Sequence, residues 1–121
     1  MRENIVVRKL KENFYKRIDK NNELQFLDSS TLNHALCLEI ADGTFGNFPI
    51  SYEDLCHKIR RKIGSRSTIL NSLNNAVAKK YFIKKNVDYD KRIKIYKLSE
   101  NFQQTIIDWI NELKKVTSEI I

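Results

Sequence analysis

Residues 50–99 constrain the fold of this chain most, because two short capped helices and two strand-like segments follow one another there. Ser51 begins a capping-box pattern, which predicts a short helix ending near Ile59. Ser65 is the expected N-cap of a second helix that extends to about Lys80. Residues 60–64 between the two helices are predicted to be a basic turn, which one apolar residue, Ile63, anchors.

The remainder of this stretch has the pattern of a β-hairpin. Residues 81–87 and 93–98 are rich in aromatic and β-branched side chains, and in the second segment apolar residues alternate with Lys at the period of a strand. Residues 88–92 lie between them and predict a polar hairpin tip.

The two ends of the chain have the apolar spacing of amphipathic helices. Near the N-terminus apolar residues recur every four positions over residues 4–20, and Asn21-Asn22 is the expected end of that helix. At the other end Ser99 is the expected N-cap of a helix whose apolar stripe continues to Ile120. A narrow apolar stripe on a terminal helix belongs either to the local core or to a dimer interface. Because the two stripes match, we expect a dimer interface. Its predicted residues are Val6, Leu10, Phe14, Ile106, Ile110, Leu113 and Val116.

One further helix is predicted between these regions. Residues 23–28 are expected to be a polar linker, after which Ser29 or Ser30 caps a helix that ends near Asp42. Gly43 is the expected stop signal, because glycine commonly terminates helices. The predicted fold class is therefore mainly α (α+β).

Positive charge is concentrated in the same part of the chain as the hairpin. From Lys58 to Leu98 there are thirteen Lys and Arg residues and two Asp residues, a net charge of +11. The whole chain has a net charge of +7, so the remainder carries −4. This segregation is typical of a nucleic-acid-binding surface on a mildly acidic scaffold. The alternative is a solvated basic face without a partner.

The predicted helix after Ser65 has one apolar face and one polar face that lacks negative charge. Small or planar hydrogen-bonding side chains of this kind suit phosphates at a helix N-terminus and base edges beyond it. Asparagine also lowers helix propensity, so a contact surface explains the polar face better than stability does. Its residues are Arg66, Ser67, Thr68, Asn71, Asn74 and Asn75.

The order of these elements is that of a winged helix-turn-helix. Two motifs resemble the MarR family of bacterial transcription regulators. Residues 65–69, Ser-Arg-Ser-Thr-Ile, are similar to the S-R-S-T-V start of that family's recognition helix. Asp90, Arg92 and Leu98 have the spacing of its wing signature, D-x-R-x-x-x-x-x-L-T-x-x-G, although Phe102 stands at the position of the closing glycine. The turn before Ser65 is about two residues longer than is usual in the family.

The resemblance implies a homodimer that binds double-stranded DNA, with each recognition helix in a major groove and Arg92 at a minor groove. Asp90 would orient the wing. The implied divisions are a dimerisation helix and linker (1–28), a winged helix-turn-helix (29–99) and a C-terminal dimerisation helix (100–121). The predicted DNA-binding residues are Arg60, Arg61, Lys62, Ser65, Arg66, Ser67, Thr68, Asn71, Asn75, Lys84, Lys91, Arg92 and Lys94.

Other function classes receive little support from the sequence. The chain has no glycine-rich phosphate loop and no nucleophile motif, so we expect no enzyme activity and no cofactor. The residues His34, Cys37, Cys56 and His57 are a weak metal-site pattern, and reduced structural thiols are the expected state of both cysteines. Without a long apolar segment, a cytoplasmic, nucleoid-associated location is expected. A winged-helix protein-interaction or replication module of a plasmid or phage is the alternative function, and a small-molecule effector is left open.

Overall fold

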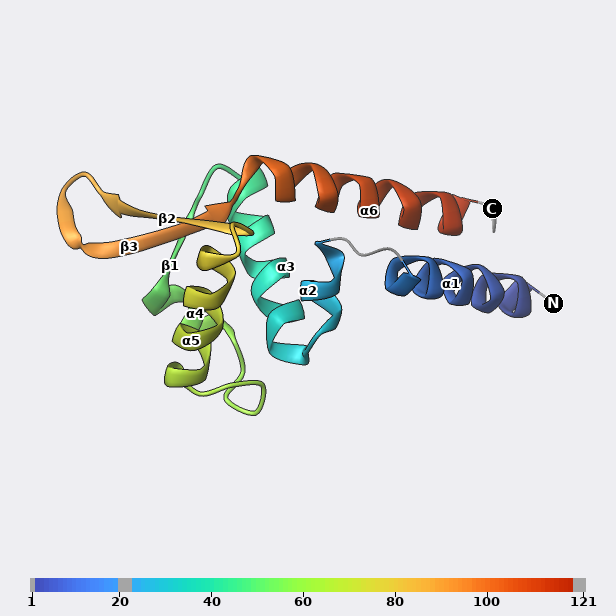
Figure 1. Ribbon diagram of the computed structural model, residues 1–121, viewed down its shortest axis with the longest axis horizontal. Coiled ribbons are helices and arrows are strands. Elements are labelled where there is room, and N and C mark those ends of the chain that lie inside the picture. Colours follow the sequence, from blue (N-terminus) through green and yellow to red (C-terminus); the bar gives the residue numbers. More distant parts are fainter. Residues whose placement is uncertain (1, 20–22, 119–121) are drawn as a thin grey trace.

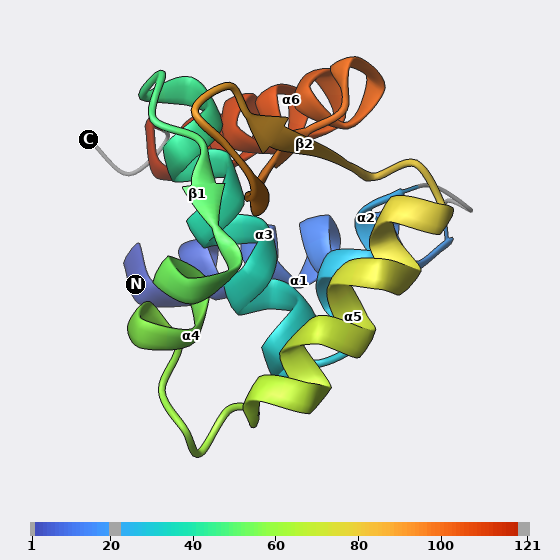
Figure 2. The ribbon, with the colours of Figure 1, turned by 90° about the vertical axis from the view of Figure 1, so that its left-hand side faces the viewer.

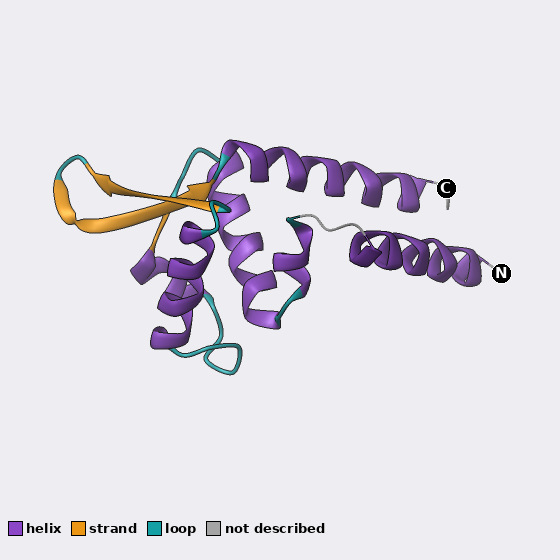
Figure 3. Cartoon of the chain, viewed as in Figure 1, coloured by secondary structure: helices purple, strands orange, loops and turns teal. Residues whose placement is uncertain are grey.

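The computed structural model describes residues 2–19 and 23–118, which form a mainly helical chain with a small antiparallel sheet (Figures 1 and 3). The predicted α-rich (α+β) composition is therefore confirmed. None of the described helices is long and apolar enough to cross a membrane. The predicted helix end at Asn21-Asn22 and the stripe residue Ile120 lie outside the described residues. The elements are α1 (Arg2–Asp19), α2 (Leu24–Asp28), α3 (Thr31–Phe45), β1 (Ile50–Ser51), α4 (Tyr52–Lys58), α5 (Arg66–Ala78), β2 (Phe82–Val87), β3 (Asp90–Leu98) and α6 (Glu100–Ser118).

Helix α3 passes through the centre of the core. Ser30 is its N-cap, and the Ser30 hydroxyl accepts a hydrogen bond from the Asn33 N–H at 3.0 Å. Leu36 and Ile40 are completely buried, since residues four apart share one face of a helix. The predicted helix after Ser30 is thus confirmed at its start.

The predicted end of this helix at Gly43 is wrong, because α3 continues to Phe45. Gly43 instead allows a close approach of the following loop. The Phe48 N–H donates to the Gly43 carbonyl at 2.8 Å. A Cβ on Gly43 would lie 2.7 Å from the Phe48 carbonyl oxygen, which is closer than real side chains come. The glycine is required here by packing and not by helix termination.

The predicted polar linker before α3 is also wrong. Residues 24–28 form helix α2, and Leu24, Phe26 and Leu27 of this helix are buried. The Phe26 ring packs edge-on against Phe82 of β2 with centroids 5.7 Å apart. A five-residue helix is too short to show a helical period, so its apolar residues gave no signal in the sequence.

Helices α4 and α5 begin where their caps predicted. The Ser51 hydroxyl accepts from the Asp54 N–H at 3.1 Å. The Ser65 hydroxyl accepts from the Thr68 N–H at 3.3 Å. These bonds satisfy N–H groups that the first turn of a helix otherwise leaves unpaired. The cap of α4 therefore lies at the end next to β1, and the cap of α5 lies at the end that faces the turn between the two helices.

The sheet has the strand order β1-β3-β2, and both pairs are antiparallel. The predicted hairpin is confirmed, but its tip is shorter than the predicted residues 88–92, because β3 begins at Asp90. A register irregularity between Asn86 and Val87 accompanies this tight turn. Strand β1 has only two residues and was not predicted; Ile50 pairs with Tyr96. Figure 2 shows β1 beside the hairpin and next to α4.

Helices α1 and α6 lie side by side and extend away from the sheet (Figure 1). The N-terminal half of α6 belongs to the core, where Phe102 is completely buried. The Ser99 hydroxyl accepts from the Phe102 N–H at 3.2 Å, which confirms the predicted cap. Helix α1 has a polar contact with its neighbours: Arg17 donates to Asp28 at 3.1 Å, and Asn13 is buried.

The predicted dimer residues divide into two groups. Ile106 and Val116 are buried within the single chain, so the prediction that they form a surface for a second copy is corrected. Ile106 packs in the core, and Val116 borders the space between α1 and α6. Val6 and Leu113 are half-buried, whereas Leu10, Phe14 and Ile110 are exposed. Only the exposed and half-buried residues of the two stripes can therefore contact a second copy of the chain.

Candidate nucleic-acid interface

Helix α5 separates its apolar and polar residues onto opposite faces. Ile69, Leu73 and Ala76 are buried in the core. Ser67, Asn71 and Asn74 recur at the same helical spacing on the other side and are exposed. The predicted residues Thr68 and Asn75 are exposed as well. The structure therefore places an uncharged, hydrogen-bonding face at the surface of the molecule.

The predicted residue Arg66, at the start of α5, is tied to helix α4. Its guanidinium forms an ion pair with Glu53 and lies over the Tyr52 ring at 5.4 Å from the centroid. The Tyr52 hydroxyl donates to the Arg66 carbonyl at 3.0 Å. The hydrogen bond to Glu53 and its negative charge raise the pKa of Arg66 above the ordinary value. The guanidinium is thus held in one direction while its side chain stays 56% exposed.

Tyr52 and Glu53 were not among the predicted site residues. Glu53 is thirteen positions from Arg66 and reaches it only because α4 and α5 pack together. The pKa of Tyr52 is raised mainly by burial and, to a smaller extent, by a hydrogen bond with the Cys56 side chain. In the sequence these residues belong to the first turn of a capped helix, where an acidic residue is expected for helix stability alone.

The basic turn between α4 and α5 presents its cations outward. The Ile63 N–H donates to the Arg60 carbonyl at 2.9 Å, and Ile63 packs against the core. Arg60, Arg61 and Lys62 are exposed. Arg61 and Ser65 border an open hollow of about 690 Å³ at the start of α5. An anion there would meet a positive side chain and the N-terminus of a helix.

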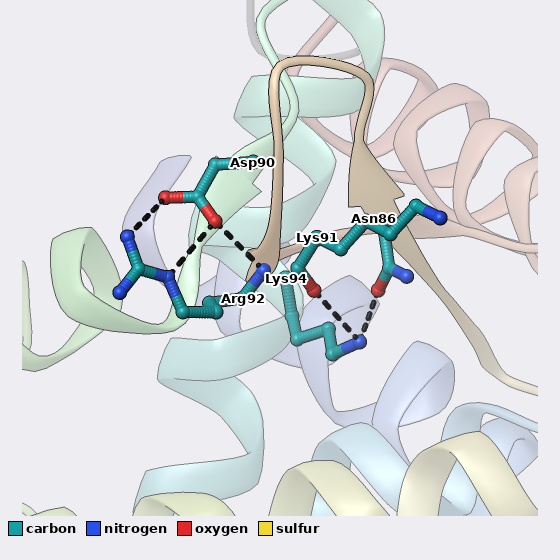
Figure 4. A network of polar contacts seen from close by, with 5 residues as sticks. All are labelled: Asn86, Asp90, Lys91, Arg92 and Lys94. Carbon is teal, nitrogen blue, oxygen red and sulfur yellow. Dashed lines mark hydrogen bonds and ion pairs between the residues drawn. The ribbon is translucent and has the colours of Figure 1, made fainter.

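At the hairpin tip, Arg92 bonds to Asp90, which lies two positions before it in the chain (Figure 4). Asp90 accepts from the Arg92 backbone N–H at 2.9 Å, from Nε at 3.1 Å and from Nη2 at 3.2 Å. These side-chain and backbone hydrogen bonds lower the pKa of Asp90. The Arg92 side chain is 91% exposed, so it projects into solvent in a fixed direction. Asp90 therefore holds Arg92 at the hairpin tip, and its role in orienting the wing stays a prediction.

The other predicted hairpin residues differ in availability. Lys84 and Lys91 are exposed. The Lys94 ammonium instead bonds across the hairpin to Asn86 and lies 3.4 Å from the Lys91 carbonyl oxygen (Figure 4). Lys94 is half-buried, and its ammonium is occupied by bonds within the hairpin. Lys84 and Lys91 are therefore the more accessible cations of this group.

The predicted cations and the polar face of α5 gather at one end of the molecule. Figure 1 shows α4, α5 and the hairpin at the end opposite the chain termini, and Figure 2 views this end directly. Along the chain, the basic turn comes directly before α5 and the hairpin comes directly after it. A polar helix face bordered by exposed positive side chains is an arrangement that fits a polyanion.

His34, Cys37, Cys56 and His57, the residues of the weak metal-site pattern, do not come together as a metal site. Cys37 is buried, and burial raises the pKa of its thiol to about 12. His34 packs edge-on against Trp109 at 6.3 Å. Cys37 and Cys56 are both free thiols. Within residues 2–19 and 23–118 no group of three or more His, Cys, Asp or Glu side chains is placed to hold a metal ion.

Comparisons of this chain with protein-family models, with curated proteins and with solved structures gave no match. Functional inference therefore depends on the geometry and charge of the residues described above.

Proposed function

We propose that this protein is a sequence-specific, double-stranded DNA-binding transcription regulator. The observation that carries the proposal is the exposed, uncharged face of α5 among the cations of the turn and hairpin. DNA recognition needs both kinds of group, because phosphate contacts supply affinity and base contacts supply specificity. A basic surface for general solvation has no need of an asparagine-rich helix at its centre.

The element order α3, β1, α4, α5, β2, β3 supports assignment of a MarR-like winged helix-turn-helix. In this assignment α5 is the recognition helix and the β2–β3 hairpin is the wing. Ser67, Asn71 and Asn75 contact base edges in the major groove. Arg92 reaches the adjacent minor groove, where a narrow groove attracts arginine.

Phosphate contacts come from the residues on either side of α5. Arg60, Arg61 and Lys62 contact one stretch of backbone from the turn. Lys84 and Lys91 contact another from the hairpin. Each phosphate neutralised releases condensed counterions, so binding falls steeply as salt rises.

A homodimer completes the proposal. The exposed residues Leu10, Phe14 and Ile110 supply apolar surface on α1 and α6. Burial of such surface between two copies is favourable, because apolar contact with water is costly. Two recognition helices related by a two-fold axis would then occupy successive major grooves.

The test combines DNA binding with sizing of the protein. The purified chain is mixed with random-sequence duplexes at low and at physiological salt, bound duplexes are selected and sequenced, and its mass in solution is measured. The proposal predicts retention at low salt, weaker binding at higher salt, a palindromic consensus and a dimer. Absence of binding at low salt contradicts DNA binding and favours a protein-interaction module. A monomer that binds DNA without a consensus favours a replication or architectural role.

A further inference from the structure

The ion pair between Arg66 and Glu53 has unused hydrogen-bonding groups on its solvent side. Arg66 Nη2 donates to Glu53 Oε1, and among the described residues this is the one hydrogen bond that the guanidinium and the carboxylate make. The Arg66 and Glu53 side chains are 56% and 63% exposed. The pair therefore presents N–H donors of a guanidinium next to a free carboxylate oxygen.

Two contacts fix the pair in place. The Arg66 guanidinium lies over the Tyr52 ring, and the Tyr52 hydroxyl bonds to the Arg66 backbone carbonyl. Glu53 is in the first turn of α4, which Ser51 caps. Because both partners begin on capped helices, their relative position is set before any ligand binds. Less conformational freedom is then lost on binding than for two independent surface side chains.

Helix stability accounts for an acidic residue in the first turn of α4, but pairing of Glu53 with Arg66 does not favour phosphate binding at this position. Glu53 adds negative charge beside the basic turn and repels a phosphate. It also uses part of the hydrogen-bonding capacity of Arg66. A base pair differs from a phosphate in having donors as well as acceptors. In the major groove, guanine presents the N7 and O6 acceptors, and its partner cytosine presents the N4 donor.

We propose that Arg66 and Glu53 together bind one G·C base pair, with Arg66 donating to guanine and Glu53 accepting from cytosine N4. This inference rests on the proposed function and adds the base identity that the start of α5 recognises. Glu53 is then a specificity residue that belongs to α4 and not to the recognition helix. An A·T pair in the same orientation would place the adenine N6 donor opposite the donors of Arg66 and the thymine O4 acceptor opposite the Glu53 carboxylate.

The experiment is selection from random duplexes by the wild-type protein and by three variants. Glu53→Gln preserves the shape and can still accept from Arg66, but it lacks the second carboxylate oxygen. Asp54→Asn removes the neighbouring carboxylate of the same helical turn and is the matched charge control. Arg66→Lys keeps the positive charge and loses the two-pronged geometry. Circular dichroism checks that each variant is folded.

The wild type is expected to enrich one G·C pair in each half-site, preferred over A·T by roughly tenfold or more in direct competition. Glu53→Gln should reduce that preference to about threefold or less, and Arg66→Lys should weaken it at the same pair. Asp54→Asn should keep it.

The inference is overturned if Glu53→Gln selects the wild-type consensus with equal discrimination, or if Asp54→Asn loses the same base pair. It is also overturned if Arg66→Lys and Glu53→Gln affect different positions. In each of these cases DNA binding itself persists, and the proposed function stands. A wild-type protein that retains no duplex at low salt overturns both.

Discussion

Helices α5 and α1 are both amphipathic, yet they expose opposite faces. In α5 the apolar residues Ile69 and Leu73 are buried, and polar residues face solvent. In α1 the buried residue is Asn13, whereas Leu10 and Phe14 are 45% and 43% exposed. Burial of apolar surface is the main favourable term in folding. Helix α5 buries Ile69 and Leu73 within one chain, whereas α1 leaves Leu10 and Phe14 in contact with solvent. In the proposed function, α5 belongs to the ligand-binding end of the molecule and α1 to the self-association end.

The largest expected effect comes from a matched pair of leucines. Leu73→Ala removes a completely buried side chain and should lower the free energy of unfolding by about 2 to 5 kcal/mol. Leu10→Ala removes an exposed one and should change it by less than about 1 kcal/mol at low protein concentration. Urea unfolding followed by circular dichroism measures both. Equal losses would contradict the distinction between the two helices.

A charge placed on the exposed face of α1 should dissociate the proposed dimer. Phe14→Glu buries a carboxylate in the interface and should raise the dimer dissociation constant at least about tenfold. Arg8→Glu introduces a carboxylate at another exposed position of the same helix, about 120° around the axis from Phe14, and should have a smaller effect. Analytical ultracentrifugation compares them. A wild-type chain that is monomeric at all concentrations would remove the dimer from the account.

The cap of α5 should have a moderate effect. Ser65→Ala removes the acceptor for the Thr68 N–H and should cost about 1 kcal/mol of unfolding free energy. Ser67→Ala, two positions later, should change it by less than about 0.5 kcal/mol, since Ser67 is exposed and its hydroxyl contacts Ser65 Oγ and not an unpaired N–H of the helix. Thermal unfolding of the two variants separates capping from a general loss of a hydroxyl.

The smallest effect is a shift in a titration. Arg92 lowers the pKa of Asp90, so their contact is present above the ordinary aspartate pKa and is lost as the pH falls through the lowered value. The orientation of Arg92 should therefore be constant from neutral pH down to about pH 4. NMR titration of the Asp90 carboxyl should show the lowered value, and Arg92→Ala should return it toward about 3.9. An unchanged titration in Arg92→Ala would mean that Arg92 does not cause the shift.

Local patterns in the sequence predicted much of the fold. Ser30, Ser51, Ser65 and Ser99 all cap the helices assigned to them, because a cap depends on a hydroxyl and the few backbone groups that follow it. The hairpin was predictable from its period-two alternation. The extent of its tip was not, since the register irregularity beside Val87 depends on the pairing of two strands.

The errors involve contacts between residues distant in sequence. In helix α2, Phe26 packs against the ring of Phe82. Phe82 is far away in the sequence, so residues 24–28 alone do not reveal this contact. Ile106 belongs to the core although its helix has the stripe of an interface, because the sequence pattern does not say what an apolar face packs against. Glu53 was missed at the candidate site for the same reason: its partner Arg66 is on another helix.

The salt dependence of DNA binding tests the central claim most directly, because the claim divides the surface into phosphate-binding cations and a base-contacting helix face. Binding of one selected duplex and one unrelated duplex is measured over a range of salt for the wild type, Lys84→Ala and Asn71→Ala. We predict that Lys84→Ala weakens binding to both duplexes and reduces the salt slope by about one, whereas Asn71→Ala keeps the slope and weakens only the selected duplex. Equal effects of the two variants on both duplexes, or no binding by the wild type at low salt, would contradict the account.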